Sequence, residues 1–245
     1  MIWACGDALT RGFLIGGTAG RTTLNGEGVQ HQDGHSHVLA SVVPNLMTYD
    51  PAFGFELAVI VREGIRRMYQ EQEDIFYYIT VYNENYTHPP INDVTHESIL
   101  KGMYCFKRAS KDLEDKYQGE PIHLLGSGSI MQQVIRAQQE LEQEGIPTNI
   151  WSVTSYNLLH KDYQEARSEG KSSYLETILE NEQGHFISVS DWITLLPDSL
   201  AHLFPGTFTA LGTDGFGLSD SREALRNYFG ISSQAIIDKA KELAK

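Results

Sequence analysis

The chain has 245 residues, of which 41% are apolar and 21% charged, and this is typical of one large or two small globular domains and not of a disordered chain. Its 32 acidic and 19 basic residues give a net charge of −13, which disfavours nucleic acid or a membrane surface as a partner. Two cysteines, no apolar run near the ~20 residues of a membrane span and no signal-peptide pattern predict a cytoplasmic protein.

The first half of the chain predicts a loop-rich start and then strand, helix and strand. Residues 12–37 are rich in Gly, Thr, Asn, Gln and His without a sustained period, which indicates polar loops of the kind that carry function. Residues 46–50 predict a strand that ends in an Asp-Pro turn, and residues 55–71 have helical apolar spacing. Residues 74–82 are β-branched and aromatic with almost no alternation, which predicts a strand of a parallel sheet buried on both faces.

A domain junction is expected where this pattern breaks. The segment from Asn83 to Pro90 contains helix and strand breakers, and residues 107–120 hold eight charged residues in fourteen. We therefore predict a partial first domain over residues 1–115 and a second domain over residues 116–245.

The second domain has a regular pattern of alternating strands and helices. The predicted strands are 122–126, 149–154, 186–190 and 208–211. The predicted helices are 129–144 with a capping box at Ser129, 162–169, 191–204, 220–230 with Asp220 as the cap, and one from 233. This alternation predicts an α/β fold with right-handed crossovers.

The run His31-Gln-Asp33-Gly-His35-Ser-His37 is the main candidate for chemistry. Imidazoles beside a carboxylate suit proton transfer near neutral pH, and they also suit a transition metal. A polar surface turn is the third reading. Gly34 argues against a metal, because it interrupts the helix or strand that would aim the ligands.

Three glycine-rich segments could each have either a ligand-binding or a structural role. The segment from Arg21 to Gly28 suits close approach to a ligand or an ordinary tight turn. Gly126-Ser-Gly128-Ser suits an anion, but Met131 replaces the third glycine of a dinucleotide fingerprint, so a structural role is favoured. Residues 211–222 follow a predicted strand and suit either a ligand or partner site or the start of a helix. Glu84 also follows a strand and suits either a ligand site or a solvated loop.

Several blocks of sequence keep their order along nearly the whole chain. They are the run from Arg11 to Gly28, Gln30-His31-Gln-Asp33-Gly34-His35-Ser36-His37, Tyr49-Asp50-Pro51-Ala52-Phe53, Tyr78-Ile79-Thr80-Val81-Tyr82-Asn83-Glu84, Leu125-Gly126-Ser127-Gly128, Trp151-Ser152-Val153-Thr154-Ser155 and Leu211-Gly-Thr-Asp-Gly-Phe-Gly217. These blocks closely resemble the last third of homodimeric bacterial pyruvate dehydrogenase E1 components, of the transketolase-like thiamine diphosphate family.

The resemblance implies the end of a pyrimidine-binding α/β domain followed by a transketolase C-terminal-like α/β domain. It implies oxidative decarboxylation of pyruvate with thiamine diphosphate and Mg²⁺, and acetyl transfer to the lipoyl group of the E2 component. The implied partners are the upstream E1 portion or a second E1 chain, the E2 component, and further copies in a homo-oligomer. His31 and then His37 match the family's catalytic positions, and Asn25, Glu27, Asp33 and His35 belong to the substrate-site loop.

The sequence departs from the family pattern in three ways. Gln32 replaces the Glu that is usual beside His31, the Gly-Asp-Gly…Asn motif for Mg²⁺ and diphosphate is absent, and so is the glutamate that activates the aminopyrimidine. We therefore expect this chain to be inactive alone and not to hold the cofactor tightly. The incomplete first domain should also leave an open sheet edge that invites association. The alternatives are a non-catalytic dimerisation or docking module and a His-cluster metal enzyme.

Overall fold

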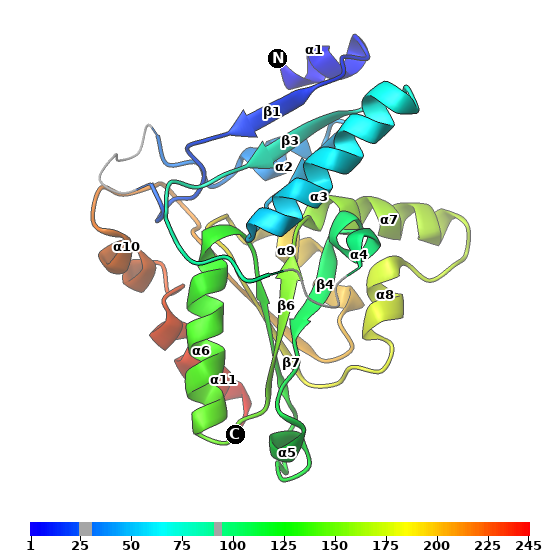
Figure 1. The fold of residues 1–245 in the computed structure, drawn as a ribbon. Helices are drawn as coiled ribbons and strands as arrows, with labels where there is room; N and C mark the ends of the chain where they lie inside the picture. Colours follow the sequence, from blue (N-terminus) through cyan, green and yellow to red (C-terminus); the bar gives the residue numbers. More distant parts are fainter. Residues whose placement is uncertain (25–30, 91–94) are drawn as a thin grey trace.

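The computed structural model describes residues 1–24, 31–90 and 95–245, which fold around two separate β-sheets (Figure 1). The first sheet is parallel and contains, in spatial order, β1 (Phe13–Gly16), β3 (Phe76–Thr80) and β2 (Leu46–Tyr49). The second contains, in spatial order, β4 (Met103–Lys107), β6 (Thr148–Val153), β5 (Ile122–Gly126), β7 (His185–Val189) and β8 (Thr207–Leu211). Only β4 runs antiparallel to its neighbour.

The helices of the first part surround the smaller sheet. They are α1 (Ile2–Asp7), α2 (Ser36–Ala40), α3 (Gly54–Ile65) with a π-helical continuation over Arg66–Gln70, and α4 (His96–Leu100). The predicted strands at 46–50 and 74–82 and the predicted helix at 55–71 are confirmed. Strand β3 is central and largely buried because it pairs on both sides, as its continuous apolar character indicated.

The helices of the second part lie on both faces of the larger sheet. They are α5 (Lys111–Glu114), α6 (Met131–Gln143), α7 (Tyr156–Ser168), α8 (Tyr174–Leu179), α9 (Leu195–Ser199), α10 (Arg222–Tyr228) and α11 (Ser233–Leu243). On one face, Val134 of α6 and Ile237 of α11 pack with Leu124 of β5. On the other face, Leu159 and Leu175 of α7 and α8 pack against Trp151 and Phe186. The expected α/β fold is therefore confirmed.

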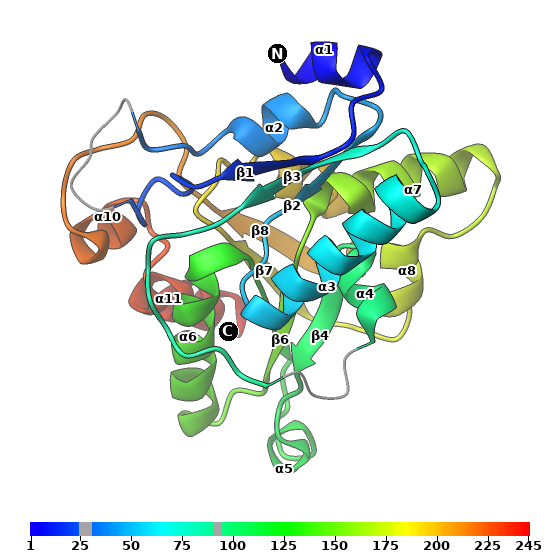
Figure 2. The same ribbon diagram turned by 45° about the horizontal axis from the view of Figure 1, so that its top comes forward.

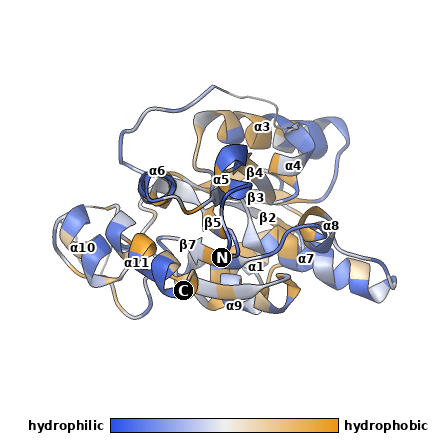
Figure 3. Cartoon of the chain, turned by 90° about the horizontal axis from the view of Figure 1, so that it is seen from below, coloured by the Kyte–Doolittle hydropathy of each residue, from blue (hydrophilic) through white to orange (hydrophobic). Residues whose placement is uncertain are grey.

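Hydropathy follows this layering. In Figure 3 the strands and the inward sides of the helices carry most of the hydrophobic colour, whereas α5 and α6 are largely hydrophilic on their outer sides. Among the described residues, no helix is both long and apolar enough to serve as a membrane span.

Local details differ from the sequence prediction at several places. Strand β1 lies within the stretch predicted to be loops, and Ser221 rather than Asp220 caps α10. The predicted helix over residues 191–204 is wrong at its start, because Asp191 precedes the short α9 and turns inward to hold another loop. The capping box predicted at Ser129 is also wrong, since a 3₁₀ turn over Gly128–Ile130 precedes α6 and the Ser129 hydroxyl instead contacts Thr23.

The two sheets meet at the carboxyl ends of the strands of the larger one (Figures 1 and 2). Glu56 of α3 is fully buried there and accepts hydrogen bonds from the hydroxyls of Tyr104 on β4 and Ser152 on β6, both at 2.6 Å. The Asp50 amide, just after β2, donates to the Thr154 carbonyl at 2.8 Å. Strand β4 thus belongs to the second sheet although it precedes residue 115, and the boundary near that residue stays a prediction.

Candidate functional site

The histidine-bearing segment crosses the junction between the two sheets. Asp33 orders it, because one carboxylate oxygen accepts hydrogen bonds from the amides of His35 (3.1 Å) and Ser36 (3.0 Å) at the start of α2. The Tyr78 hydroxyl of β3 lies 2.7 Å from the Ser36 hydroxyl. Asp33 is therefore occupied by the backbone amides that lead into α2.

The three histidines of this segment have different environments. His31 and His35 are exposed, and His35 Nδ1 lies 3.4 Å from the Arg21 guanidinium. His37 is only 7% exposed and its ring meets the Trp192 ring edge-on at 4.6 Å. Burial lowers the pKa of His37, so its imidazole is neutral near pH 7. Asn25 and Glu27 lie outside the described residues.

A buried network fixes the orientation of His37. The Thr80 hydroxyl donates its single hydrogen to Asp50 at 2.6 Å, and His37 Nε2 lies 3.1 Å from the same hydroxyl oxygen. Asp50 also accepts hydrogen bonds from Trp192 Nε1 at 2.9 Å and from the Tyr82 hydroxyl. The His37 ring is therefore held by Thr80 at the end of β3 and by Trp192 after β7.

The second sheet holds the polar loop that precedes the histidines. The Asp191 carboxylate, 1% exposed, accepts hydrogen bonds from the amide and hydroxyl of Thr22 (2.9 and 2.8 Å) and of Thr23 (3.1 and 2.6 Å). Burial raises the pKa of Asp191 above its usual value and outweighs the opposing effect of the two threonine hydroxyls and the Thr22 amide. The Ile193 amide donates to the Gly34 carbonyl at 2.9 Å. The segment after β7 thus holds the stretch that contains His31 on both sides, at Thr22 and Thr23 before it and at Gly34 after it.

Sequence reasoning placed Thr22 and Thr23 in a candidate ligand loop, but it did not identify Asp191 or Trp192 as site residues. Asp191 was assigned to a helix, and nothing local in the sequence indicates that its carboxylate reaches a loop more than 160 residues earlier. The one available signal was its position directly after a buried strand, where open α/β sheets present polar side chains.

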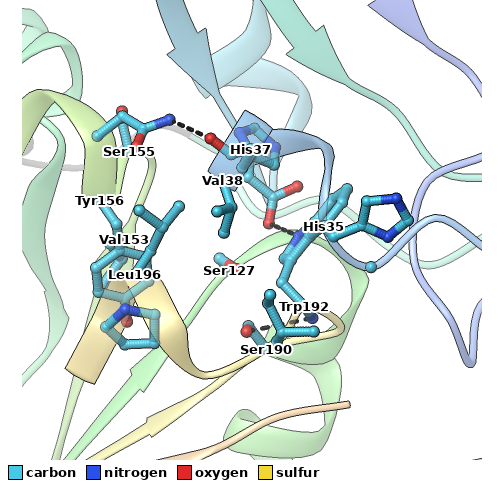
Figure 4. A pocket seen from close by; sticks show the side chains of 15 residues that line it. His35, His37, Val38, Ser127, Val153, Ser155, Tyr156, Ser190, Trp192 and Leu196 are labelled. Carbon is cyan, nitrogen blue, oxygen red and sulfur yellow. Dashed lines mark hydrogen bonds between the residues drawn. The ribbon is translucent and has the colours of Figure 1, made fainter. Parts of the chain in front are cut away.

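The cavity next to His37 is small. It has a volume of about 30 Å³ and its lining includes Ser127, Ser155, Ser190 and Trp192. Figure 4 shows the side chains of α2 and those that follow β6 and β7 facing one another across it. Such a volume holds one or two waters, whereas ligand pockets span ~300–1,000 Å³. His37 therefore faces no substrate-sized space formed by the described residues.

The glycine segments have structural roles in the described chain. Gly128 adopts φ +49°, and a Cβ there would lie 2.3 Å from the Tyr82 hydroxyl, so the turn is filled by the protein itself. Gly212 similarly allows close approach to the Trp192 carbonyl, and the buried Thr213 hydroxyl donates to the Asp191 carbonyl at 3.0 Å. Glu84 is not solvated, because it forms a buried ion pair with Arg226.

Among the described residues, the histidine segment offers no ready metal site and the Gly126–Ser129 turn offers no ready site for the cofactor's diphosphate. No three His, Cys, Asp or Glu side chains among them group in a metal-binding arrangement. The Gly126–Ser129 turn offers no free cradle, since Tyr82 fills it and the Gly128 amide donates to the Asp50 carbonyl at 3.3 Å. The residues that the structure describes therefore do not fit a Mg²⁺–diphosphate group.

Comparisons with known proteins agree with this architecture. Residues 1–89 match the model of the pyruvate dehydrogenase E1 component middle domain, and residues 102–232 match that of the transketolase-like C-terminal domain. The chain is 46% identical to the pyruvate dehydrogenase E1 component of Pseudomonas aeruginosa and 43% identical to that of Mycobacterium tuberculosis, over 99% and 95% of its length. It spans only 28% and 26% of those relatives.

Solved structures show the same fold. A transketolase variant from Pichia stipitis superposes with a TM-score of 0.72 at 17% identity, over 99% of this chain and 31% of that one. A split-gene transketolase superposes with a TM-score of 0.64 at 15% identity, over 95% and 68%. The chain therefore belongs to the transketolase-like family and corresponds to a C-terminal part of its pyruvate dehydrogenase E1 members.

Proposed function

We propose that this chain is the C-terminal part of a cytoplasmic pyruvate dehydrogenase E1 and that it supplies His31 to an active site completed by other polypeptide. The complete enzyme would decarboxylate pyruvate with thiamine diphosphate and Mg²⁺ and transfer the acetyl group to the lipoyl group of E2. The main support is the clamped loop: Asp191 and Ile193 hold it at the carboxyl ends of the strands, while His31 is exposed beyond it.

His31 and His37 take different roles in this proposal. His31 is exposed, so it can meet a reactant and exchange a proton where charge develops on the intermediate. His37 is neutral, buried and bound to Thr80, so it orders the wall of the site. Because the described residues do not fit the Mg²⁺–diphosphate group, no catalytic step is assigned to that group on this chain.

The missing half of the site would come from the upstream E1 portion or a second E1 chain. Strand β1 pairs only with β3 in the described sheet, and Leu14 and Ile15 on it are exposed, which suits a neighbouring chain. One solved relative is a split-gene transketolase whose title calls it an inactive β4 tetramer. By analogy, we propose that this chain assembles as a homo-oligomer or split subunit and is inactive alone.

Reconstitution tests the proposal. The chain is mixed with the preceding part of the Pseudomonas aeruginosa relative, and pyruvate decarboxylation is measured with thiamine diphosphate and Mg²⁺. We expect activity only in the mixture, and a loss of about 100-fold or more for His31→Ala, because general acid–base groups contribute ~10²–10⁴. His202→Ala, also at an exposed histidine, should retain activity.

Each failure of this experiment has its own meaning. Full activity of the His31→Ala mixture would remove the assigned role of His31. Failure of the unmodified mixture to react would favour the alternative, a non-catalytic dimerisation or docking module. Calorimetry of the isolated chain with thiamine diphosphate and Mg²⁺ is the third measurement, and tight binding would contradict the proposed dependence on other polypeptide.

A further inference from the structure

A larger groove, away from the His37 cavity, is lined by residues of α6, of α10 and of the start of α11. Figures 1 and 2 show these three helices next to one another. Its volume is about 690 Å³, within the range of small-molecule sites. None of its lining residues belongs to the 31–37 segment, so what it binds does not depend on the proposed activity.

The charge of this groove is opposite to that of the chain. Three arginines, Arg136, Arg222 and Arg226, line it together with one carboxylate, that of Glu223, although the chain as a whole carries −13. Arg226 is neutralised by Glu84. The remaining two arginines outnumber the Glu223 carboxylate, which leaves the groove lining with a net positive charge.

Neither of these two guanidinium groups has a carboxylate partner in the described part of the chain. Arg222 Nε donates to the Thr23 carbonyl at 2.8 Å, and its other contacts are the carbonyl and side-chain oxygens of Asn83, so its acceptors are neutral. Arg136 is exposed and makes no hydrogen bond or ion pair within the described ranges. Arg222 is thus fixed in place with its charge unbalanced, and Arg136 is free to close on a ligand.

Neutral donors complete the groove wall. Gln133 is only 6% exposed and lines the groove, and its Oε1 accepts a hydrogen bond from the Ser233 amide at 3.1 Å. That hydrogen bond uses only Oε1, and Gln133 Nε2 makes no hydrogen bond to the described residues. Nε2 and the Ser233 hydroxyl are therefore donors available to an acceptor in the groove.

We propose that the groove between α6, α10 and α11 binds the phosphate group of a small molecule, through the Arg136 and Arg222 guanidinium groups and the Gln133 amide. Planar guanidinium groups and neutral N–H and O–H donors match the several acceptor oxygens of a phosphate. A single carboxylate has fewer acceptor oxygens and would use only part of these donors. Free inorganic phosphate and a phosphate monoester share this chemistry.

A ³¹P NMR titration of the whole chain tests the proposal at low ionic strength, with inorganic phosphate and glycerol 2-phosphate in separate arms. We expect saturable binding in at least one arm, and the tighter arm identifies the source of the phosphate. Arg136→Gln should weaken it about tenfold, because a hydrogen bond to a charged group is worth at least that factor. Ser233→Ala should weaken it less, and both changes leave the fold contacts described above intact.

Arg167→Gln is the matched control, since it removes the same charge from an exposed site on α7. Equal weakening by Arg136→Gln and Arg167→Gln would show only long-range charge attraction and overturn the site. Absence of binding in both arms would also overturn it. A hexaglutamate peptide that binds through Arg136 while neither phosphate does would assign the groove to an acidic protein partner instead.

Discussion

The Asp191 carboxylate accepts hydrogen bonds from both the amide and the hydroxyl of Thr23, at 3.1 and 2.6 Å, across 168 residues of sequence. This contact joins the carboxyl end of β7 in the larger sheet to the loop that leads into the histidine segment. Asp191 makes the same pair of contacts with Thr22, so one buried side chain binds two consecutive residues of the loop.

Asp191→Asn should therefore destabilise the protein. The new amide group replaces one acceptor oxygen, and although the threonine hydroxyls can rotate away, one backbone amide loses its buried partner. An unsatisfied buried donor costs ~1–3 kcal/mol, so we expect the free energy of unfolding in urea to fall by about 2 kcal/mol. Asp198→Asn, at an exposed position on α9, should change the free energy of unfolding little. If Asp191→Asn were as stable as the unmodified protein, the contacts of Asp191 with the two threonines would not contribute to stability.

Because Arg226 and Glu84 form an ion pair, the effects of substituting these two residues on stability should be strongly coupled. Both side chains are mostly buried, at 6% and 18% exposure, and Nη1 lies 3.1 Å from Oε1. Removing one partner leaves a buried charge, so Arg226→Gln and Glu84→Gln should each cost ~3 kcal/mol. The double variant should cost clearly less than the sum of the two. Additive losses in a urea double-mutant cycle would contradict a direct pair.

Two glycines with positive φ differ in the space around them, so replacing each with alanine compares an open site with a packed one. Gly145, at φ +86°, has open space where a Cβ would stand, so Gly145→Ala should cost only the ~1 kcal/mol of left-handed backbone. Gly128→Ala adds a clash with the Tyr82 hydroxyl, which Asp50 holds, so we expect at least ~3 kcal/mol from backbone strain and displacement together. Similar thermal stability of the two variants would show that the Gly128 turn is loose.

The buried histidines predict a pH dependence of stability. Burial lowers the pKa of both His37 and His123, so the unfolded chain binds protons more readily than the folded one. The contribution of these two histidines to stability is then full above the unfolded histidine pKa of ~6.5 and declines as pH falls below it, by at most ~1.4 kcal/mol per pH unit for each group. Urea unfolding from pH 7.5 to 5.5 measures the slope. His37→Gln should reduce it and His202→Gln should not, and an unchanged slope in His37→Gln would mean that His37 is charged when folded.

The elements with strong local signals were predictable from sequence. Strand β5 and helix α6 combine a continuous apolar run with a periodic apolar stripe, and Gly145 at φ +86° follows the helix end as expected. Strand β4 was missed, because its pairing with β6 is a long-range contact that its five residues do not indicate. Helix α7 begins at Tyr156, earlier than predicted, because Ser155 caps it at a strand end.

The sequence by itself determined the α/β class, most of the strands, the family resemblance and the candidate role of the 31–37 segment, since these depend on local periodicity and on motifs in order. Only the tertiary structure decided that His37 is buried while His31 and His35 are exposed, that Asp191 and Trp192 hold the segment, and that Glu84 pairs with Arg226. The physical reason is that burial and hydrogen bonding of a polar side chain are set by residues brought from distant parts of the chain, and local sequence does not encode their separation.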